Sequence, residues 1–488
     1  MSDHSNLVID ALDKTDPELA KRIDADNSWK SGLVRSGARV ALYREYEIGD
    51  HRADMTDQMR KMLRLKTGDD ELSEFNDNYC EVIIDMEASR LFVSSITGDD
   101  TSQEWIEDTL ERNRFISEHG QWCRGAIRDG DAFVMVDLNA NWISVPAYDG
   151  FSGLVVIFSG DTNKAIWACK LWSEANNEDD ATNVTMKLVV YQADKISYFE
   201  GSENGAGVTA TDEPKPWLLD DLPIVPFVNK KDTYADGGRS ELRPAIPLQD
   251  VLNRSLHSLV MAFELSAFGI KYSIGMEISL DGIVPGGVVG LVIKDSAGNV
   301  MTELTDAQLD FLKSVSVGQF DATDVTQYLQ VLDKIVQQLG QVTQTPIRGV
   351  ASSNQISGEA LRQLEIGLLG KVKRFQWQNT NAFMDLLNLT ADIQNAYDTG
   401  KGSAPELGAV KIAWKDAELL DINARITALK DLRADSPGLF SDDFYIEQIG
   451  SLLELSQADI NDQKEAVAEQ QGREWDRLTG AGGEIPAV

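Results

Sequence analysis

Two aspartates that flank a glycine are the residues whose spacing comes closest to a chemical site. Asp129 and Asp131 surround Gly130, and paired carboxylates of this kind bind divalent cations in metal-dependent nucleases. The same Asp-Gly-Asp pattern is also typical of a turn that leads into a strand, here Ala132–Val136. The turn is the favoured interpretation, because no further cluster of carboxylates accompanies the pair.

Motifs for other kinds of catalysis are not found in the sequence. It has no GxxxxGK[ST] phosphate loop, no HExxH, no paired CxxC and no GxSxG. Three acidic pairs are typical of solvated loops rather than nuclease sites: Asp99-Asp100, Asp179-Asp180 and Asp442-Asp443. We therefore expect no enzymatic activity, no cofactor and no bound metal.

The cysteines and histidines lack the spacing of a disulfide framework or a metal site. The cysteines are three in number and widely separated, namely Cys80, Cys123 and Cys169. The histidines show no helical or finger-like pairing, and they stand at His4, His51, His119 and His257. Buried, reduced thiols are the expected state, which fits a protein made in a cytoplasm. The polar start and the lack of a long apolar run predict neither a signal peptide nor a membrane span.

The acidic composition limits how the protein can meet nucleic acid. The formal net charge is −34, from 79 Asp and Glu against 45 Lys and Arg. A protein that grips DNA over its whole surface needs many cations for the phosphates, so that class is disfavoured. An acidic wall past which DNA slides without adhering remains compatible with this charge, and so does solubility alone.

One basic cluster stands out on this acidic chain. Lys371, Lys373 and Arg374 lie within four positions of one another, in a segment with helical apolar spacing. One interpretation is a contact with a phosphate or with another subunit. The other is an exposed helix face whose cations balance neighbouring acids.

The elements that would position these residues indicate an α+β protein. Short strand-like runs separated by Gly, Asp and Asn fill residues 131–230, with a loop over 201–221. Apolar stripes then predict long helices over 248–268 and about 322–341, and a third helix from Gly358. Between them the sequence places a small glycine-rich insert and, after Thr345-Pro346, a polar loop. The remainder, after a strand at 410–414, is predicted to be helical.

The order and spacing of several segments resemble the portal proteins of tailed bacteriophages, especially the branch found in phages of actinobacteria. The segments that carry this resemblance are Leu42–His51, Asp77–Cys80, Arg90-Leu91, Ala126–Val134, Pro226–Asn229, Gly238–Glu241, Ile246–Asp250, Val317–Asp321, Thr345-Pro346 and Ser357–Leu361. The resemblance implies a portal-like fold, with long stem helices, a β-rich wing, a small clip insert and a helical crown.

The resemblance also implies a division of the chain. The parts would be N-terminal helices and wing over 1–240, a stem helix over 241–269, a clip over 270–320, a second stem helix over 321–344, a tunnel loop over 345–357, a long wing and crown helix over 358–400, and a crown over 401–488. The tunnel-loop residues implied to face DNA are Arg348, Ser352, Ser353, Asn354 and Gln355.

The function implied by the resemblance is that of a conduit without chemistry of its own. It predicts a ring of copies, typically twelve, at one vertex of a virion head, assembled in the host cytoplasm. Its partners would be double-stranded DNA passing without sequence specificity, terminase, a head-completion or adaptor protein, and the major capsid and scaffold proteins. Another ring-forming head–tail connector and, from the residues alone, a metal-dependent DNA-processing enzyme are the alternatives.

Overall fold

The fold is known from a computed structural model in which most of the chain is described. The residues described are 4–23, 28–51, 76–159, 164–177, 180–202, 207–231, 237–267, 271–274, 305–307, 310, 314, 316–319, 326–347, 358–397, 399–417, 422–435, 441–452, 460 and 463–467. They divide into two compact units, residues 1–415 and 416–488. The predicted tunnel-loop residues and most of the predicted clip lie outside the described part.

The chain starts with helices, as predicted. These are α1 (Ser5–Thr15), α2 (Pro17–Ile23) and α3 (Ser28–Ile48). Gly49 follows α3 with φ +77°, a conformation that glycine adopts readily where a helix ends. Within α3, a Cβ on Gly37 would lie 2.7 Å from the backbone nitrogen of Gly150, so glycine allows the helix to approach this loop closely.

The β-rich region is built around a six-stranded antiparallel sheet. Its strands are β4 (Gly153–Phe158), β5 (Ala165–Asn177), β6 (Asp180–Gln192), β7 (Lys195–Ser202), β8 (Val208–Ala210) and β9 (Lys215–Pro216). The predicted strands at the positions of β4 to β7 are confirmed. The loop predicted over 201–221 is wrong in part, because β8 and β9 both pair with β7 there. Buried Val208 is one apolar residue among acids and prolines, too weak a pattern to predict a strand.

Alternation along β5 explains how this sheet buries both faces. Trp167, Cys169 and Leu171 are each at most 1% exposed and pack with Leu7 and Leu12 of α1. The residue between the first two, Ala168, instead joins the core on the opposite face. Side chains two positions apart share a face of a strand, so the sheet lies between the N-terminal helices and a second layer.

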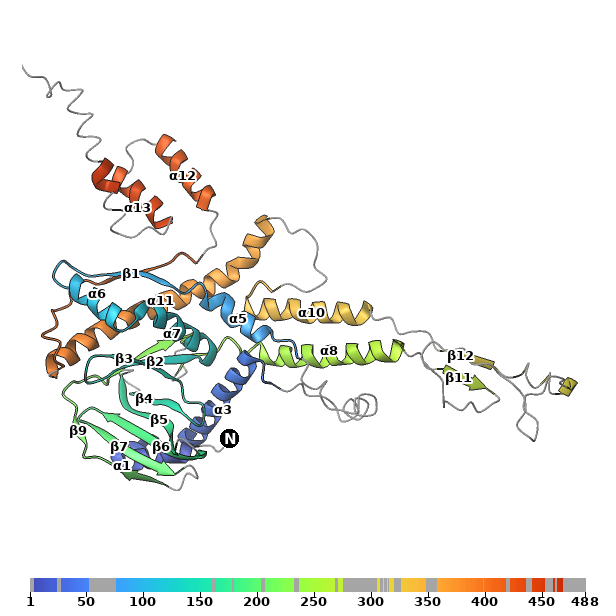
Figure 1. Cartoon of the computed structure of the whole chain (residues 1–488), viewed down its shortest axis with the longest axis horizontal. Coiled ribbons are helices and arrows are strands. Elements are labelled where there is room, and N and C mark those ends of the chain that lie inside the picture. The colour runs from blue at the N-terminus through green and yellow to red at the C-terminus, as the bar shows by residue number, and fades with distance from the viewer. Residues whose placement is uncertain are drawn as a thin grey trace, which may run out of the picture. The chain divides into compact units, whose positions relative to one another are not determined.

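That second layer is a three-stranded sheet in the order β10-β2-β3. Its strands are β2 (Asp131–Val136), β3 (Trp142–Pro146) and β10 (Ile224–Val228). The predicted strands at β2 and β3 are confirmed, and β10 lies in the segment predicted to close the β-rich region. Phe133, Met135 and Ile224 of this sheet contribute to the core that includes Ala168. Figure 1 shows the two sheets with the N-terminal helices on the far side of the larger one.

Two helices cover the other face of the three-stranded sheet and bring an aromatic cluster with them. They are α7 (Phe115–Asp129) and α11 (Gly358–Ala396), and the predicted helices at both places are confirmed. Phe383 of α11 lies with its ring centroid 5.0 Å from that of Phe227 and 5.7 Å from that of Phe115. Burying such rings contributes roughly 2–3 kcal/mol each, so α11 is fixed to the body along this face.

The remaining elements of the first unit frame α11. They are α5 (Tyr79–Ala88), α6 (Gln103–Arg112) and the antiparallel pair β1 (Val93–Thr97) and β13 (Lys411–Trp414). Trp414 of β13 donates its indole N–H to Thr380 of α11 at 3.0 Å. The second unit contains α12 (Ile422–Asp435) and α13 (Asp442–Leu452), which agrees with the helical end predicted from the sequence.

The two predicted long helices that enclose the insert are confirmed as α8 (Ile246–Ala267) and α10 (Thr326–Thr343). They pack against each other and run side by side in opposite directions (Figure 1). Of the segment between them, the described strands are β11 (Lys271–Ile274) and β12 (Ser316–Gln319), which form an antiparallel pair. No helix among the described residues is both long enough and apolar enough to cross a membrane.

Candidate functional site

The first turns of α8 are fixed to the body by a buried polar network. Gln249 and Asn253 are fully buried, one helical turn apart. Gln249 accepts a hydrogen bond from the backbone N–H of Tyr79 at 3.0 Å and donates to the carbonyl of Asp77 at 2.6 Å. Asn253 accepts from the Asp77 N–H at 3.1 Å and lies 3.0 Å from Nε2 of His51. These amides satisfy the start of α5, so α8 leaves the body in a defined direction.

A second contact reinforces this attachment. Tyr46 of α3 stacks on His51 with ring centroids 4.2 Å apart, and its hydroxyl donates to Asp250 of α8. Burial lowers the pKa of His51, while burial and the hydrogen bond to Asp250 raise the pKa of Tyr46. Both groups are therefore neutral at pH 7, and the base of α8 is held without a buried charge on either ring.

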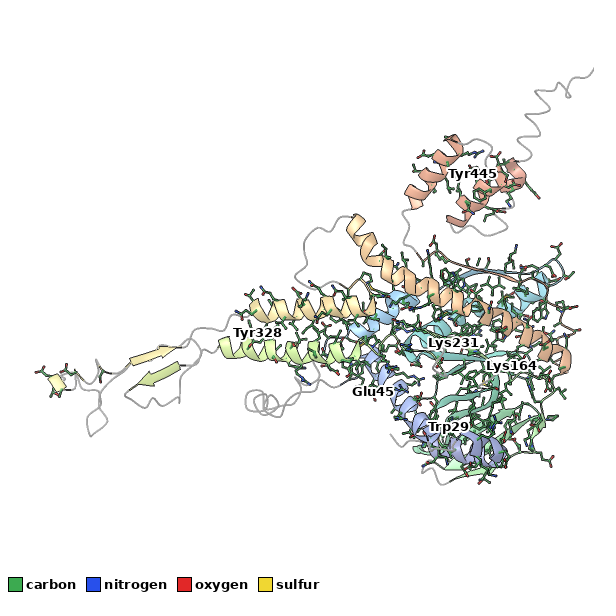
Figure 2. All side chains as sticks on the ribbon, turned by 180° about the vertical axis from the view of Figure 1, so that it is seen from behind. Trp29, Glu45, Lys164, Lys231, Tyr328 and Tyr445 are labelled. Atoms are coloured by element: carbon green, nitrogen blue, oxygen red, sulfur yellow. The ribbon has the colours of Figure 1, made fainter. Side chains whose placement is uncertain are left out.

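The apolar stripes of α8 and α10 are covered only near the body. Leu252 near the start of α8 is 2% exposed, and it packs with Ile335 and Val336 of α10. Phe263, later on the same predicted stripe of α8, is 64% exposed, and Leu329 on the stripe of α10 is 50% exposed. Figure 2 shows the early part of α10, at Tyr328, beside the later part of α8. The free half of the helix pair thus presents apolar side chains that this chain alone does not cover.

The outer surface of α10 is rich in glutamine and nearly uncharged, although Val331 and Val342 are also exposed on this helix. Its exposed side chains include five glutamines, namely Gln327, Gln330, Gln337, Gln338 and Gln341. The helix carries one acid and one base, Asp333 and Lys334. A surface of neutral amides hydrates well and attracts phosphate weakly, so it suits a wall past which a polyanion moves.

The chain turns sharply where α10 ends. Gln344 has a positive φ of +53°, and buried Thr345 donates its N–H to the carbonyl of Gly340 at 2.9 Å. The end predicted at Thr345-Pro346 is therefore confirmed. The predicted DNA-facing residues that follow lie outside the described residues: Arg348, Ser352, Ser353, Asn354 and Gln355.

The basic cluster of α11 divides between the interior and the surface. Lys371 is 2% exposed at its side chain, and its Nζ lies 2.9 Å from Glu87 and 3.0 Å from Glu241. Burial opposes its charge, but the two carboxylates outweigh burial and raise the pKa of Lys371. This lysine is therefore committed to an ion pair within the chain. Lys373 and Arg374 are exposed, and the predicted phosphate or subunit contact stays with them.

Sequence reasoning missed both partners of Lys371 because they stand far away along the chain. Glu87 lies on α5, and Glu241 lies in the segment that enters α8. Glu241 also pairs with Lys230 at 2.5 Å. A signal was available, since Lys371 falls three positions after Leu368 and four before Phe375 on the apolar stripe of the helix. A lysine that is buried at such a position requires carboxylates close to its ammonium group.

The Asp129-Gly130-Asp131 segment is a turn between α7 and β2. Gly130 has φ +102°, a conformation that glycine adopts without strain. Asp129 is paired with Arg44 at 3.0 Å and with Arg128 at 2.7 Å. Asp131 accepts from the N–H of Gly238 at 2.8 Å, and burial raises its pKa to about 6. Of the two interpretations, the geometry matches the turn, and within the described residues no group of three or more metal-ligating side chains gathers.

The thiols and imidazoles are placed as packing groups. Cys80, Cys123 and Cys169 are free and fully buried, and burial raises the pKa of Cys80 and Cys123 to about 12. His119 is held between Phe92 and Phe115, with Nδ1 2.8 Å from the carbonyl of Phe115. Thiols of this kind are protonated and unreactive at pH 7.

A known family matches most of the chain. Residues 72–472 match the family profile described as "Phage portal protein, SPP1 Gp6-like". The chain belongs to this family of phage portal proteins. Portal proteins are structural components of the virion rather than enzymes, which is the class expected from the sequence. No curated protein is recognisably similar to the chain.

Solved structures of similar fold come from gene transfer agent (GTA) particles. The neck of an empty GTA particle, computed with C6 symmetry, is 10% identical with a TM-score of 0.39, covering 82% of this portal protein and 95% of that chain. The virion of a native GTA particle is 10% identical with a TM-score of 0.40, covering 83% and 96%. The neck of a native GTA particle, computed with C12 symmetry, is 10% identical with a TM-score of 0.37, covering 82% and 95%. The assignment rests on the family profile.

Proposed function

We propose that this portal protein assembles into a closed ring, with twelve copies, around a channel that carries double-stranded DNA. The observation that carries the proposal is the uncovered half of the α8–α10 pair. Phe263 and Leu329 lie on stripes whose parts nearer the body are buried, so a neighbouring copy of the same pair is the simplest surface to cover them. Identical copies that repeat one contact around an axis leave a central hole.

The charge of the chain supports a channel that does not hold its cargo. With a net charge of −34 and a glutamine-rich outer face on α10, a ring of stems offers DNA little to bind. Weak, non-specific contact lets a polyanion pass in both directions, for packaging and for ejection.

The proposal assigns the parts of the chain as the sequence resemblance implies. Residues 1–240 would be the N-terminal helices and wing, 241–269 and 321–344 the stem helices, 270–320 the clip and 345–357 the tunnel loop. Residues 358–400 would be the long wing and crown helix, and 401–488 the crown. The clip would meet terminase during packaging and a head-completion or adaptor protein later, while the wing would meet the major capsid and scaffold proteins. The segments quoted for the resemblance also support placing the chain in the actinobacteriophage branch and its assembly in the host cytoplasm.

The proposal is tested by the assembly state of the purified full chain. We expect negative-stain images to show rings with a central hole, and mass photometry to give one species of about twelve subunit masses. A chain that stays monomeric across concentrations that support head assembly would contradict it.

The tunnel loop has its own test. Deleting residues 352–355 should leave rings intact and reduce DNA packaging into empty heads, measured as nuclease-protected DNA. Loss of the rings on this deletion would instead make the loop a structural element.

A further inference from the structure

The outward face of α11 carries two large apolar side chains that the body does not cover. Trp377 is 77% exposed and Ile366 is 64% exposed. They stand eleven positions apart, about 16 Å or three turns along the helix, and therefore share a face. The buried residues Leu368, Val372 and Phe375 lie on the opposite face. An exposed tryptophan is the kind of side chain that dominates the energy of protein contacts when a partner covers it.

Two cations sit on the same outward surface. Lys373 and Arg374 are exposed between Ile366 and Trp377, whereas Lys371 turns inward to its carboxylates. On a chain with a net charge of −34, an apolar face with two adjacent cations is unusual. We call the four residues Ile366, Lys373, Arg374 and Trp377 the α11 face. A partner that fits the α11 face has to offer an apolar hollow beside carboxylates.

The same chain contains such a hollow elsewhere. A cavity of about 610 Å³ is bounded by β1, α6 and the start of α7. Its apolar lining residues are Val93, Ile96, Leu110, Phe115 and Ile116, and Ile116 is 78% exposed. We call this cavity the β1–α6 groove. Its volume is sufficient for an indole together with neighbouring aliphatic groups.

The rim of the β1–α6 groove is acidic. Glu107 and Glu111 line it, together with one cation, Arg114. Both glutamates belong to α6, a ten-residue helix with four acidic residues and one arginine, all of them exposed. The groove therefore complements the α11 face in both respects, since an apolar hollow meets an apolar protrusion and acids meet cations.

We propose that the α11 face of one copy docks in the β1–α6 groove of the next copy, with Trp377 entering the groove. Lys373 and Arg374 would then lie opposite Glu107 and Glu111. Trp377 is 77% exposed in its own chain, so it does not fill its own groove. Because the two surfaces differ, the contact is head-to-tail, and such contacts close into rings when the rotation between copies closes. This inference rests on the proposed ring and adds a contact within the body to the one between stems.

Disulfide trapping tests the contact directly. The pair Trp377→Cys and Ile116→Cys, placed in one full-length chain, should form bonds between copies on mild oxidation. Denaturing gels should then show a ladder from dimer to the complete ring. The native thiols are fully buried, so background bonding is low. The matched control is Trp377→Cys with Leu218→Cys, since Leu218 is also apolar and 60% exposed but lies outside the groove; it should give at most dimers.

Charge reversal provides the second test. Lys373→Glu with Arg374→Glu should raise the concentration needed for ring formation by on the order of 30-fold or more, as loss of a central contact does. Mixing this variant with a Glu107→Lys, Glu111→Lys variant should restore mixed rings. All four side chains are exposed, so the thermal unfolding temperature should stay within about 2 °C of the wild type.

The outcomes separate this contact from the ring itself. If the wild-type chain forms rings, but the cysteine pair gives no ladder and the charge-reversed variant assembles normally, the contact is wrong while the proposed function stands. Rings that form normally but lose a motor, an adaptor or packaged DNA would assign the α11 face to that partner and overturn the inference. A wild-type chain that never forms rings would end both proposals.

Discussion

The two sides of α11 and the two halves of the α8–α10 pair differ in the same way. Towards the body, Lys371 is paired with two carboxylates and Leu252 packs against Ile335. Away from it, Trp377 and Phe263 are left mostly exposed. The proposed ring would cover these exposed side chains with a neighbouring copy.

The largest expected effect comes from breaking the body at its buried charge. Lys371→Ala leaves Glu87 and Glu241 buried without their shared ammonium. We expect the free energy of unfolding at pH 7 to fall by about 3–5 kcal/mol, measured by urea titration. Lys373→Ala, two positions away and exposed, should change it by less than about 0.5 kcal/mol. Equal effects of the two substitutions would mean that the buried ion pairs of Lys371 contribute no more to stability than the exposed side chain of Lys373.

The attachment of α8 should be the next most sensitive point. Asn253→Ala removes the acceptor of the Asp77 N–H and the partner of His51. Leaving these groups unsatisfied should cost about 1–3 kcal/mol in the free energy of unfolding. Ser255→Ala on the same helix removes an exposed bond to the carbonyl of Val251 and should be nearly neutral. If both variants unfold at the wild-type urea concentration, the network does not fix α8.

The contribution of Asp131 to the free energy of unfolding should depend on pH. Burial raises the pKa of this carboxyl to about 6 in the folded chain, so folding favours its protonated form. Its contribution is therefore fully present below about pH 4 and is lost as pH rises through 6. Asp131→Asn keeps an acceptor for Gly238 without the charge, and should add about 1–2 kcal/mol at pH 8, since the carboxyl remains partly exposed. The gain should vanish at pH 4 in parallel thermal melts; a gain equal at both pH values would contradict this cause.

The smallest effect on folding, and the largest on assembly, should come from the uncovered stem. Phe263→Ala and Leu329→Ala remove exposed side chains, so each should change the free energy of unfolding of the dissociated chain by less than about 0.5 kcal/mol. In the ring these groups would be covered, and their loss should shift the assembly equilibrium towards monomers in sedimentation velocity. Variants with a lower free energy of unfolding but a normal assembly equilibrium would contradict this expectation.

Periodicity was sufficient to predict most elements of the fold. Apolar stripes predicted the helices α8 and α11, and a short strand-like run that includes Trp167 predicted β5. It could not predict the β8 and β9 strands, because their pairing depends on β7 rather than on their own residues. The helical position of Lys371 indicates burial, but periodicity could not identify its counter-charges, because they come from two distant segments.

The candidate site was less accessible to sequence reasoning than the fold. Whether Phe263 or Leu252 of one stripe is covered depends on how far α10 extends beside α8, which no local pattern states. The predicted tunnel loop over 345–357 consists mainly of small and polar residues, and this composition is compatible with many roles. The family resemblance supplied that assignment, and it remains a prediction.

The central claim is that the uncovered surfaces of one copy are completed by another. A cryo-EM map of the purified full chain tests this most directly. We expect a closed ring in which α8 and α10 of every copy surround one hole and Phe263 is buried at the contact between copies. A map in which the chain is a separate particle, or a ring in which the α8–α10 pairs point away from the hole with Phe263 still in solvent, would contradict it.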